Sequence, residues 1–358
     1  MRTAAGTESD GSDGERRNGS DAAGIVVLGA AAAWSLITAA AHDGRPEGFL
    51  LAVLAVSAGY ASGRISGALL PVAAPGAGAL AGIGLAVAEP KFAPGPQFAV
   101  PLGQAGATAA LLTLSAGAAC CAARSARTPA PRLALWLLAA GAAVTAAVLG
   151  SAVGFTLCTA VVLCSSAAGR TGRRGLGLAG LGLVTALVTA AIWAVAADAL
   201  PDGLTASLMG RLTPHRVRLW RDALHLAQGD QGLGVGPGRF GELSSTAAQA
   251  LPPDGKPHSA LLQLAAEQGL LGVVLLAAAF CWVLYALWRS PRSTPVALSA
   301  GAALTGLAVI VSVGDALSFT TVSVGAGLLA GVATARPLVD GAPQHTADAR
   351  ARGVRPTP

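Results

Sequence analysis

The side chains best suited to chemistry gather between residues 199 and 272. This stretch contains three segments of unusual composition: TPHRVRLWRDALHLAQG (213–229), GDQGLGVGPGRFG (229–241) and PHSALLQLAAEQGLLG (257–272). Arginine offers a permanent positive charge and several N–H donors that match phosphate oxygens, and histidine can exchange a proton near neutral pH. The residue types therefore indicate binding of an anion, with a histidine available for proton transfer.

The first segment predicts an amphipathic helix. Thr213 is a typical N-cap, Pro214 suits the first helical position, and no helix-breaking residue follows before Gly229. The apolar half of this helix contains Val217, Leu219, Trp220, Ala223, Leu224, Leu226 and Ala227.

Arg216 is the exception on that helix, because it lies near the centre of the apolar half, one turn before Trp220. A charge there must extend to the membrane surface, form an ion pair or bind an anion. Contact with lipid headgroup phosphates and contact with a substrate phosphate both remain open. Arg218 and Arg221 lie on the polar half, which a solvated helix face explains.

The glycine-rich second segment does not indicate a dinucleotide site, because such sites need a preceding strand and a βαβ unit. We expect either a tight loop whose backbone closely approaches a ligand or the membrane, ending at Arg239 and Phe240, or a flexible connector.

In the third segment we place His258 at the outer end of a helix, on one face with Leu261 and Leu262. Glu267 follows nine residues later, roughly 13 Å along the helix axis, which is too far for a direct acid–base pair.

The elements that position these residues are membrane helices. The 358-residue chain has only 12% charged and 53% hydrophobic residues, with a mean hydropathy of +0.60. Its net charge of +6 comes mainly from arginines between apolar runs, which disfavours a nucleic-acid partner. The five cysteines lie inside apolar runs without CxxC spacing, so the sequence indicates neither a metal site nor a disulfide framework.

Apolar runs long enough to cross a bilayer predict an all-α integral membrane protein with about ten transmembrane helices. The runs are 22–41, 48–63, 65–88, 101–123, 132–150, 152–168, 176–198, 269–288, 295–313 and 316–334. We expect disordered cytoplasmic tails at 1–21 and 336–358, and a membrane domain at 22–335.

The arginines predict the orientation of these helices. Sixteen of the 24 basic residues fall on the side of the N-terminus, whereas the short loops on the other side hold only Arg45 and Lys91. Because basic residues are enriched on the cytoplasmic side, both termini are expected inside, with residues 199–257 forming one large extracytoplasmic loop that contains short amphipathic helices.

The motifs RVRLW (216–220), GLGVGPGRF (232–240), His258-Ser259 and EQGLLG (267–272) together resemble the O-antigen ligase and O-antigen polymerase superfamily of bacterial surface-polysaccharide enzymes. The resemblance covers roughly residues 204–275, in the same order and in a late, large loop. The family usually has His-Asn where this chain has His258-Ser259, and the N-terminal spans resemble the family only in hydrophobicity.

The resemblance implies glycosyl transfer without a metal or other cofactor at the outer face of the bacterial cytoplasmic membrane. The donor would be a glycan on undecaprenyl diphosphate, and the acceptor would be a hydroxyl group of a glycan or another envelope molecule. Arg216 would hold the diphosphate and His258 would act as the base or orient the acceptor hydroxyl. The remaining arginines expected near the diphosphate are Arg211, Arg218, Arg221 and Arg239.

Three other functions fit a polytopic membrane protein. A transporter or flippase for a lipid-linked glycan would be expected to have charges near the bilayer midplane, whereas Asp198 and Asp315 lie near the ends of apolar runs. Another class of membrane glycosyltransferase places acidic residues in a large first outer loop, but residues 42–47 form a short one. A non-catalytic envelope-assembly protein is the remaining alternative.

Overall fold

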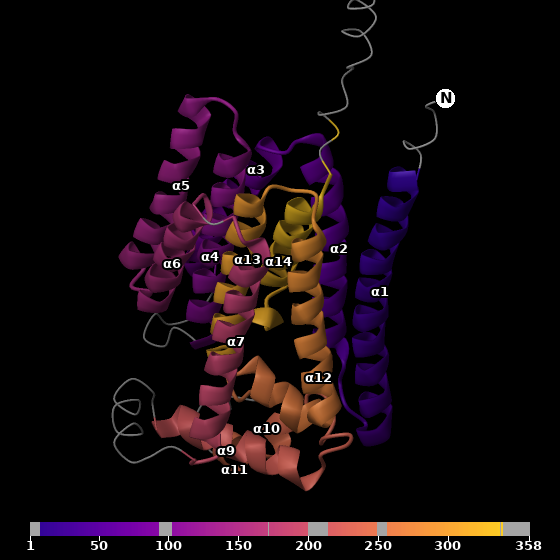
Figure 1. Cartoon of the computed structure of the whole chain (residues 1–358). Coiled ribbons are helices and arrows are strands. Elements are labelled where there is room, and N and C mark those ends of the chain that lie inside the picture. Colours follow the sequence, from indigo (N-terminus) through magenta and orange to yellow (C-terminus); the bar gives the residue numbers. More distant parts are fainter. Residues whose placement is uncertain are drawn as a thin grey trace, which may run out of the picture.

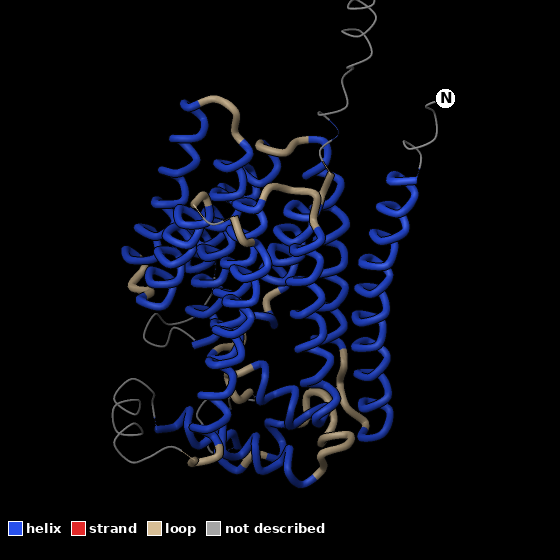
Figure 2. Tube along the Cα trace, in the orientation of Figure 1, coloured by secondary structure: helices blue, strands red, loops and turns tan. Residues whose placement is uncertain are grey.

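The protein is a bundle of long helices with a layer of shorter helices at one end (Figure 1). The computed structural model describes residues 8–92, 102–170, 172–199, 214–248, 256–336 and 338. Within these ranges every regular element is a helix, and no strand is present (Figure 2).

An apolar helix occupies the position of each apolar run. These helices are α1 (Glu8–His42), α2 (Glu47–Leu69), α3 (Ala73–Phe92), α4 (Leu102–Ser125), α5 (Pro129–Val148), α6 (Ala152–Ala168), α7 (Arg174–Ala196), α12 (Ala260–Arg289), α13 (Thr294–Val313) and α14 (Thr320–Thr334). In the described ranges, seven are long and apolar enough to cross a membrane, and Ala73–Ala88, Ala152–Ala168 and Thr320–Thr334 are shorter apolar helices. The prediction of an all-helical, multi-pass membrane protein is confirmed.

Several boundaries differ from those predicted. Helix α1 begins at Glu8, so the helix of the apolar run extends back into the expected tail of residues 1–21. No proline in this stretch interrupts it. Arg64 lies inside α2 rather than between two helices, and the actual break comes at residues 70–72, where Pro71 disfavours helical geometry in the residue before it. The last apolar run starts as a 3₁₀ turn, η1 (Ala316–Ser318), before α14. Of the expected C-terminal tail, only residues 336 and 338 are described.

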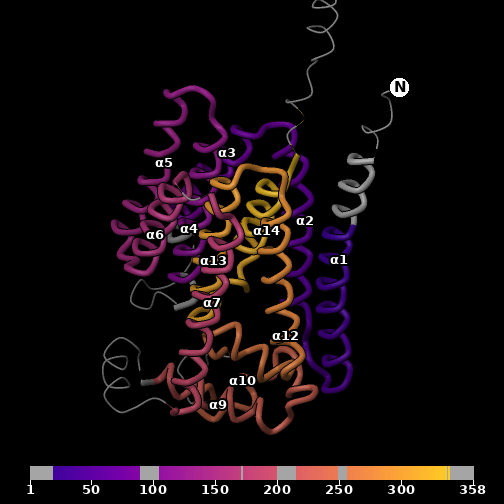
Figure 3. Tube along the Cα trace, in the orientation of Figure 1, coloured from indigo at the N-terminus to yellow at the C-terminus, as the bar shows by residue number. Residues whose placement is uncertain are grey.

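The first described turns of α1 and the end of α14 lie at one end of the bundle, and the short helices lie at the other. Ser20 and Asp21 of α1 line the same pocket as Thr334 and Arg336 at the end of α14. Helices α9 (Pro214–Gly229), α10 (Phe240–Leu243) and α11 (Ser245–Ala248) form the opposite end, where α1 meets the loop to α2 and where α12 begins (Figures 1 and 3).

Glycine allows α2 and α14 to pack backbone against backbone. A Cβ atom on Gly59 would lie 2.3 Å from the carbonyl oxygen of Val324, and one on Gly63 would lie 2.3 Å from that of Leu328. Glycines on α14 show the reciprocal contact, since a Cβ on Gly327 would lie 2.2 Å from the carbonyl oxygen of Val56. The contact positions rise together along both helices, so α2 and α14 run parallel. Small residues allow this close approach in membrane bundles.

Replacing Gly63 with alanine should therefore destabilise the protein, although alanine is the better helix former. Crowding against the carbonyl oxygen of Leu328 should cost about 1–3 kcal/mol, measured as a lower midpoint of thermal unfolding in detergent. The matched control is Gly180→Ala on α7, where nothing lies within 4 Å of an added Cβ and the midpoint should hold or rise. Equal midpoints for the two variants would contradict close α2–α14 packing.

Candidate functional site

Helix α9 packs its apolar face onto the start of α12. Val217, Leu219 and Trp220 are buried, as are Ala223 and Leu224, whereas Leu226 and Ala227 are half-buried. These side chains share a core cluster with Leu262 and Ala266 of α12. The burial of this face confirms the amphipathic helix predicted from the sequence.

A buried hydrogen bond fixes the position of α9 relative to the candidate histidine. The indole N–H of Trp220 donates to the carbonyl oxygen of Pro257 over 3.0 Å, and His258 is the next residue. Arg216 lies one turn before Trp220 on α9, about 6 Å along the helix axis. The fold therefore brings Arg216 and His258 to the same end of the bundle, on two elements that are bonded to each other.

Arg216 is half-buried, and its Nε is fully buried without a hydrogen-bond partner in the described part of the chain. Burial lowers the pKa of its guanidinium below the ordinary value. A buried cation whose donors lack protein partners favours binding of an anion. An ion pair was one of the three explanations that the sequence left open for Arg216. The structure shows no ion pair of Arg216 within the described residues.

The other predicted arginines differ from Arg216. Arg218 is exposed on α9, and Arg221 forms an exposed ion pair of 2.6 Å with Asp198, just beyond α7. Arg239 donates to the carbonyl oxygen of His42 over 3.0 Å, with its Nε 3.7 Å from Glu242. Arg211 lies outside the described residues. Among the described candidates, Arg221 and Arg239 already have protein partners.

His258 lies before helix α12 rather than on it, which corrects the sequence-based placement. The helix begins at Ala260 because Ser259 is its N-cap, with the Ser259 hydroxyl accepting from the N–H of Leu262 over 3.4 Å. His258 is 8% exposed and has a φ of 52°, a left-handed conformation that is uncommon outside glycine. Such backbone strain often marks functional positions.

The N-cap also explains the residue after the histidine. Serine and asparagine are both strong N-cap residues, because either side chain can accept from the first free N–H groups of a helix. Ser259 therefore caps α12 as an asparagine at this position could also do.

Helix α12 breaks at Gly269, and the glycine-rich loop fills the break. Gly269 has φ 69° and ψ −167°, so the carbonyls before it lose their usual helical donors. The N–H groups of Val235 and Gly236 donate to the carbonyls of Ala266 and Glu267, each over 2.9 Å. The N–H of Leu270, after the break, donates to the carbonyl oxygen of Gln231 over 3.0 Å.

A tryptophan from the first helix completes this junction. The indole N–H of Trp34 on α1 donates to the carbonyl oxygen of Gln268 over 3.0 Å. This contact could not be predicted from the sequence, because one tryptophan in an apolar run gives no signal of its partner. Three successive carbonyls at the break are thus bound from outside α12.

The same loop holds the α1–α2 connection. The N–H of Arg45 donates to the carbonyl oxygen of Pro237 over 2.7 Å, and a Cβ on Gly44 would lie 2.8 Å from that oxygen. Gly236 has φ 95°, and a Cβ there would lie 2.7 Å from the Cβ of His42. The glycine-rich segment is therefore a loop held in place by hydrogen bonds and close contacts, and its interpretation as a flexible connector is wrong.

Acidic residues around the site have structural partners. Glu267 is 5% exposed; the Gln263 amide lies 3.4 Å from its carboxylate, and the backbone N–H groups of Gly238 and Phe240 face it. Partial burial raises the pKa of Asp222, but hydrogen bonds from Ser244 and Thr246 outweigh it and hold the pKa below the ordinary value. Asp222 thus ties α11 to α9.

Lys256 forms a further contact beside the histidine. Its ammonium lies 2.8 Å from a carboxylate oxygen of Asp315 and 2.8 Å from the hydroxyl of Ser318. A carboxylate at the end of an apolar run requires such a partner, so Asp315 was a signal from which this pair could have been predicted.

The described residues contain no group of three or more His, Cys, Asp or Glu side chains that could hold a metal ion. No protein-family model, curated protein or solved structure matches this chain. Inferences about its chemistry therefore rest on the geometry of Arg216, His258 and the elements that hold them.

The role of Ser259 as a cap can be tested by two substitutions. Ser259→Asn should leave the thermal midpoint nearly unchanged, whereas Ser259→Ala should cost about 1 kcal/mol because the N–H of Leu262 loses its acceptor. Differential scanning fluorimetry of the purified protein measures both. A larger loss for asparagine than for alanine would refute the capping role.

The junction at Gly269 can be tested with Gly269→Ala. The new Cβ would lie 2.5 Å from the carbonyl oxygen of Gly232, in a backbone conformation that favours glycine. We expect release of the loop, seen as faster tryptic cleavage after Arg239 than in the wild type. The control is Gly229→Ala at the end of α9, where nothing lies within 4 Å. Unchanged cleavage in Gly269→Ala would show that the junction does not restrain the loop.

Proposed function

We propose that this protein is a membrane glycosyltransferase of the O-antigen ligase or polymerase type, which transfers a glycan from undecaprenyl diphosphate to an acceptor hydroxyl. One observation carries the proposal. The buried Nε of Arg216 has no hydrogen-bond partner among the described residues, and the neighbouring Trp220 is hydrogen-bonded to the residue before His258. A cation in need of an anion thus shares one end of the bundle with a histidine.

The departing diphosphate supplies the anion that Arg216 lacks. As the glycosidic bond breaks, negative charge develops on the phosphate oxygens, and a desolvated guanidinium stabilises that charge more than a hydrated one would. Arg216 is therefore the principal diphosphate ligand in this proposal. Arg218, exposed and without an ion pair among the described residues, is the available second cation.

His258 would act on the acceptor. Its imidazole accepts the proton of the acceptor hydroxyl as that oxygen attacks the anomeric carbon, while the bond from this carbon to the diphosphate oxygen breaks. The products are the lengthened or ligated glycan and undecaprenyl diphosphate. The Trp220–Pro257 hydrogen bond and the Ser259 cap act as positioning contacts for His258.

The distribution of arginines supports an orientation for this reaction. Arg64, Arg289 and Arg336 line a pocket at the end of the bundle where the described chain ends lie. Placing that end in the cytoplasm agrees with the enrichment of basic residues on the inner side of membranes. The α9 end then faces outward from the bacterial cytoplasmic membrane, where polyprenyl-linked glycans and envelope acceptors would be available.

The ion pairs at this end weigh against a transporter or flippase. Asp198 pairs with Arg221 and Asp315 with Lys256, so these two acidic residues are neutralised locally. Neither is available as a coupling site within a translocation path.

The proposal is tested with full-length protein in proteoliposomes. These contain undecaprenyl-diphosphate-linked oligosaccharides isolated from the bacterium that makes this protein. Release of undecaprenyl diphosphate and appearance of the lengthened or ligated glycan are measured. Arg216→Ala and His258→Ala should each lower the rate by roughly a hundredfold or more. Arg216→Lys keeps the charge but not the planar donor pair, so we expect a loss of about tenfold.

The matched control is His225→Ala, which removes an exposed histidine from the same helix as Arg216 and should leave the rate unchanged. Unfolding midpoints near the wild-type value establish that each variant is folded. Full activity in both alanine variants would eliminate the assigned roles. Movement of the lipid-linked glycan across the bilayer without glycan transfer would identify a flippase instead.

A further inference from the structure

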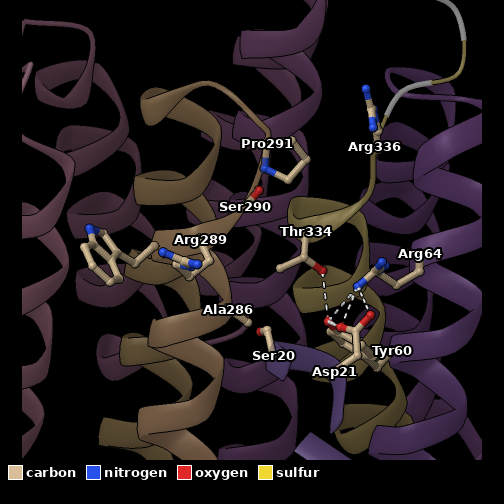
Figure 4. A pocket seen from close by; sticks show the side chains of 11 residues that line it. Ser20, Asp21, Tyr60, Arg64, Ala286, Arg289, Ser290, Pro291, Thr334 and Arg336 are labelled. Carbon is tan, nitrogen blue, oxygen red and sulfur yellow. Dashed lines mark hydrogen bonds and ion pairs between the residues drawn. The ribbon is translucent and has the colours of Figure 1, made fainter. Parts of the chain in front are cut away.

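A polar pocket lies at the opposite end of the bundle from the candidate site (Figure 4). It has a volume of about 550 Å³, within the range of about 300–1,000 Å³ typical of small-molecule sites. Its walls come from α1, α2, α12, the α12–α13 loop and the end of α14. Four stretches far apart in sequence thus converge on one cavity that the proposed glycosyl transfer does not use.

The pocket carries an excess of positive charge. Asp21, the only acidic residue among the described lining residues, is neutralised by Arg64, whose Nη1 lies 2.8 and 3.0 Å from the two carboxylate oxygens. The Tyr60 hydroxyl also donates to this carboxylate, over 3.3 Å. Arg289 and Arg336 remain, with no ion pair in the described ranges. The lining therefore has a net charge of +2.

Figure 4 shows how these groups surround the cavity, with Arg289 on one side and Arg64 and Arg336 on the other. Hydroxyl groups of Tyr60 and Thr334 lie between them, joined by a 3.3 Å hydrogen bond. The Arg289 guanidinium lies over the ring of Trp288, 5.9 Å from its centroid. Because neither Arg289 nor Arg336 has an ion pair in the described ranges, both guanidinium groups can donate to the oxygens of a phosphate ester.

The surroundings of the pocket favour a lipid as the source of that phosphate. The pocket lies where α12 and α14 end, at the depth expected for headgroups if these helices span the bilayer. Trp288, on its wall, is 50% exposed, as is typical of interfacial tryptophan. One turn further along α1, Ile25 and Val26 are exposed and offer an apolar surface for acyl chains.

We propose that this pocket binds the phosphate group of an anionic membrane lipid through Arg289 and Arg336. Arg64 serves a different purpose, because it holds Asp21 and so joins α1 to α2. A basic pocket between membrane helices is a suitable site for an anionic headgroup. The bound lipid would connect α1 to the ends of α12 and α14.

Native mass spectrometry of the full-length protein in detergent tests the proposal by titration with dioleoyl phosphatidylglycerol. The double variant Arg289→Gln/Arg336→Gln should weaken binding of phosphatidylglycerol by about thirtyfold, because the loss of each arginine weakens it by about fivefold. Both side chains are exposed, so the variant should keep the wild-type unfolding midpoint. Arg132→Gln/Arg170→Gln, which removes two exposed arginines outside the pocket, should leave binding unchanged.

Two further ligands distinguish the sources of phosphate. Dioleoyl phosphatidylcholine, with the same chains but no net charge, should bind more weakly than phosphatidylglycerol and should not respond to Arg289→Gln/Arg336→Gln. Glycerol 3-phosphate binding as tightly as phosphatidylglycerol would replace the lipid with a soluble ester as the ligand. Equal phosphatidylglycerol binding by the wild type and both double variants would overturn the site. None of these outcomes depends on glycosyl transfer.

Discussion

The break in α12 at Gly269 is the constraint on which the layer of short helices at one end of the bundle depends. A helix beside a membrane can be interrupted only if its freed carbonyls find other donors. Here Val235, Gly236 and Trp34 supply those donors. Because two of them belong to one loop, that loop must lie against α12, and its glycines must allow the close approach. The loop then fixes the α1–α2 connection by its own contacts, so one interruption organises three segments.

This organisation explains how Arg216 and His258, the two candidate side chains, come to lie at one end of the bundle although they belong to different elements. Arg216 is held by the burial of the α9 face around it, and His258 is held by the turn that leads into α12. The indole of Trp220 bonds these two supports to each other. The glycine-rich loop contributes geometry rather than charge, since its one arginine is engaged by the α1–α2 connection. In the proposed reaction, the anion site and the base would therefore be positioned by separate rigid elements.

The sequence was most informative where a regular period or a long apolar run carries the structure. Run length located the long helices, and the 3.6-residue period identified the buried face of α9 and the unusual place of Arg216. Irregular backbone was not predictable in this way, because the docking of the loop at Gly269 leaves no periodic pattern. His258 was misplaced although Ser259 is a good N-cap, since the apolar residues that follow fit a helix face equally well. Arg64 was taken for a helix end because its partner, Asp21, lies on another helix.

The parallel contact between α2 and α14 has a consequence for the biogenesis of the protein. Helix α2 leaves the ribosome long before α14, yet its glycine stripe packs directly against the α14 backbone. Until synthesis is nearly complete, that groove must face lipid or a chaperone. Closure of the bundle is thus a late, post-insertion event, and a nascent chain arrested before α14 would display an open glycine groove for membrane quality control to recognise.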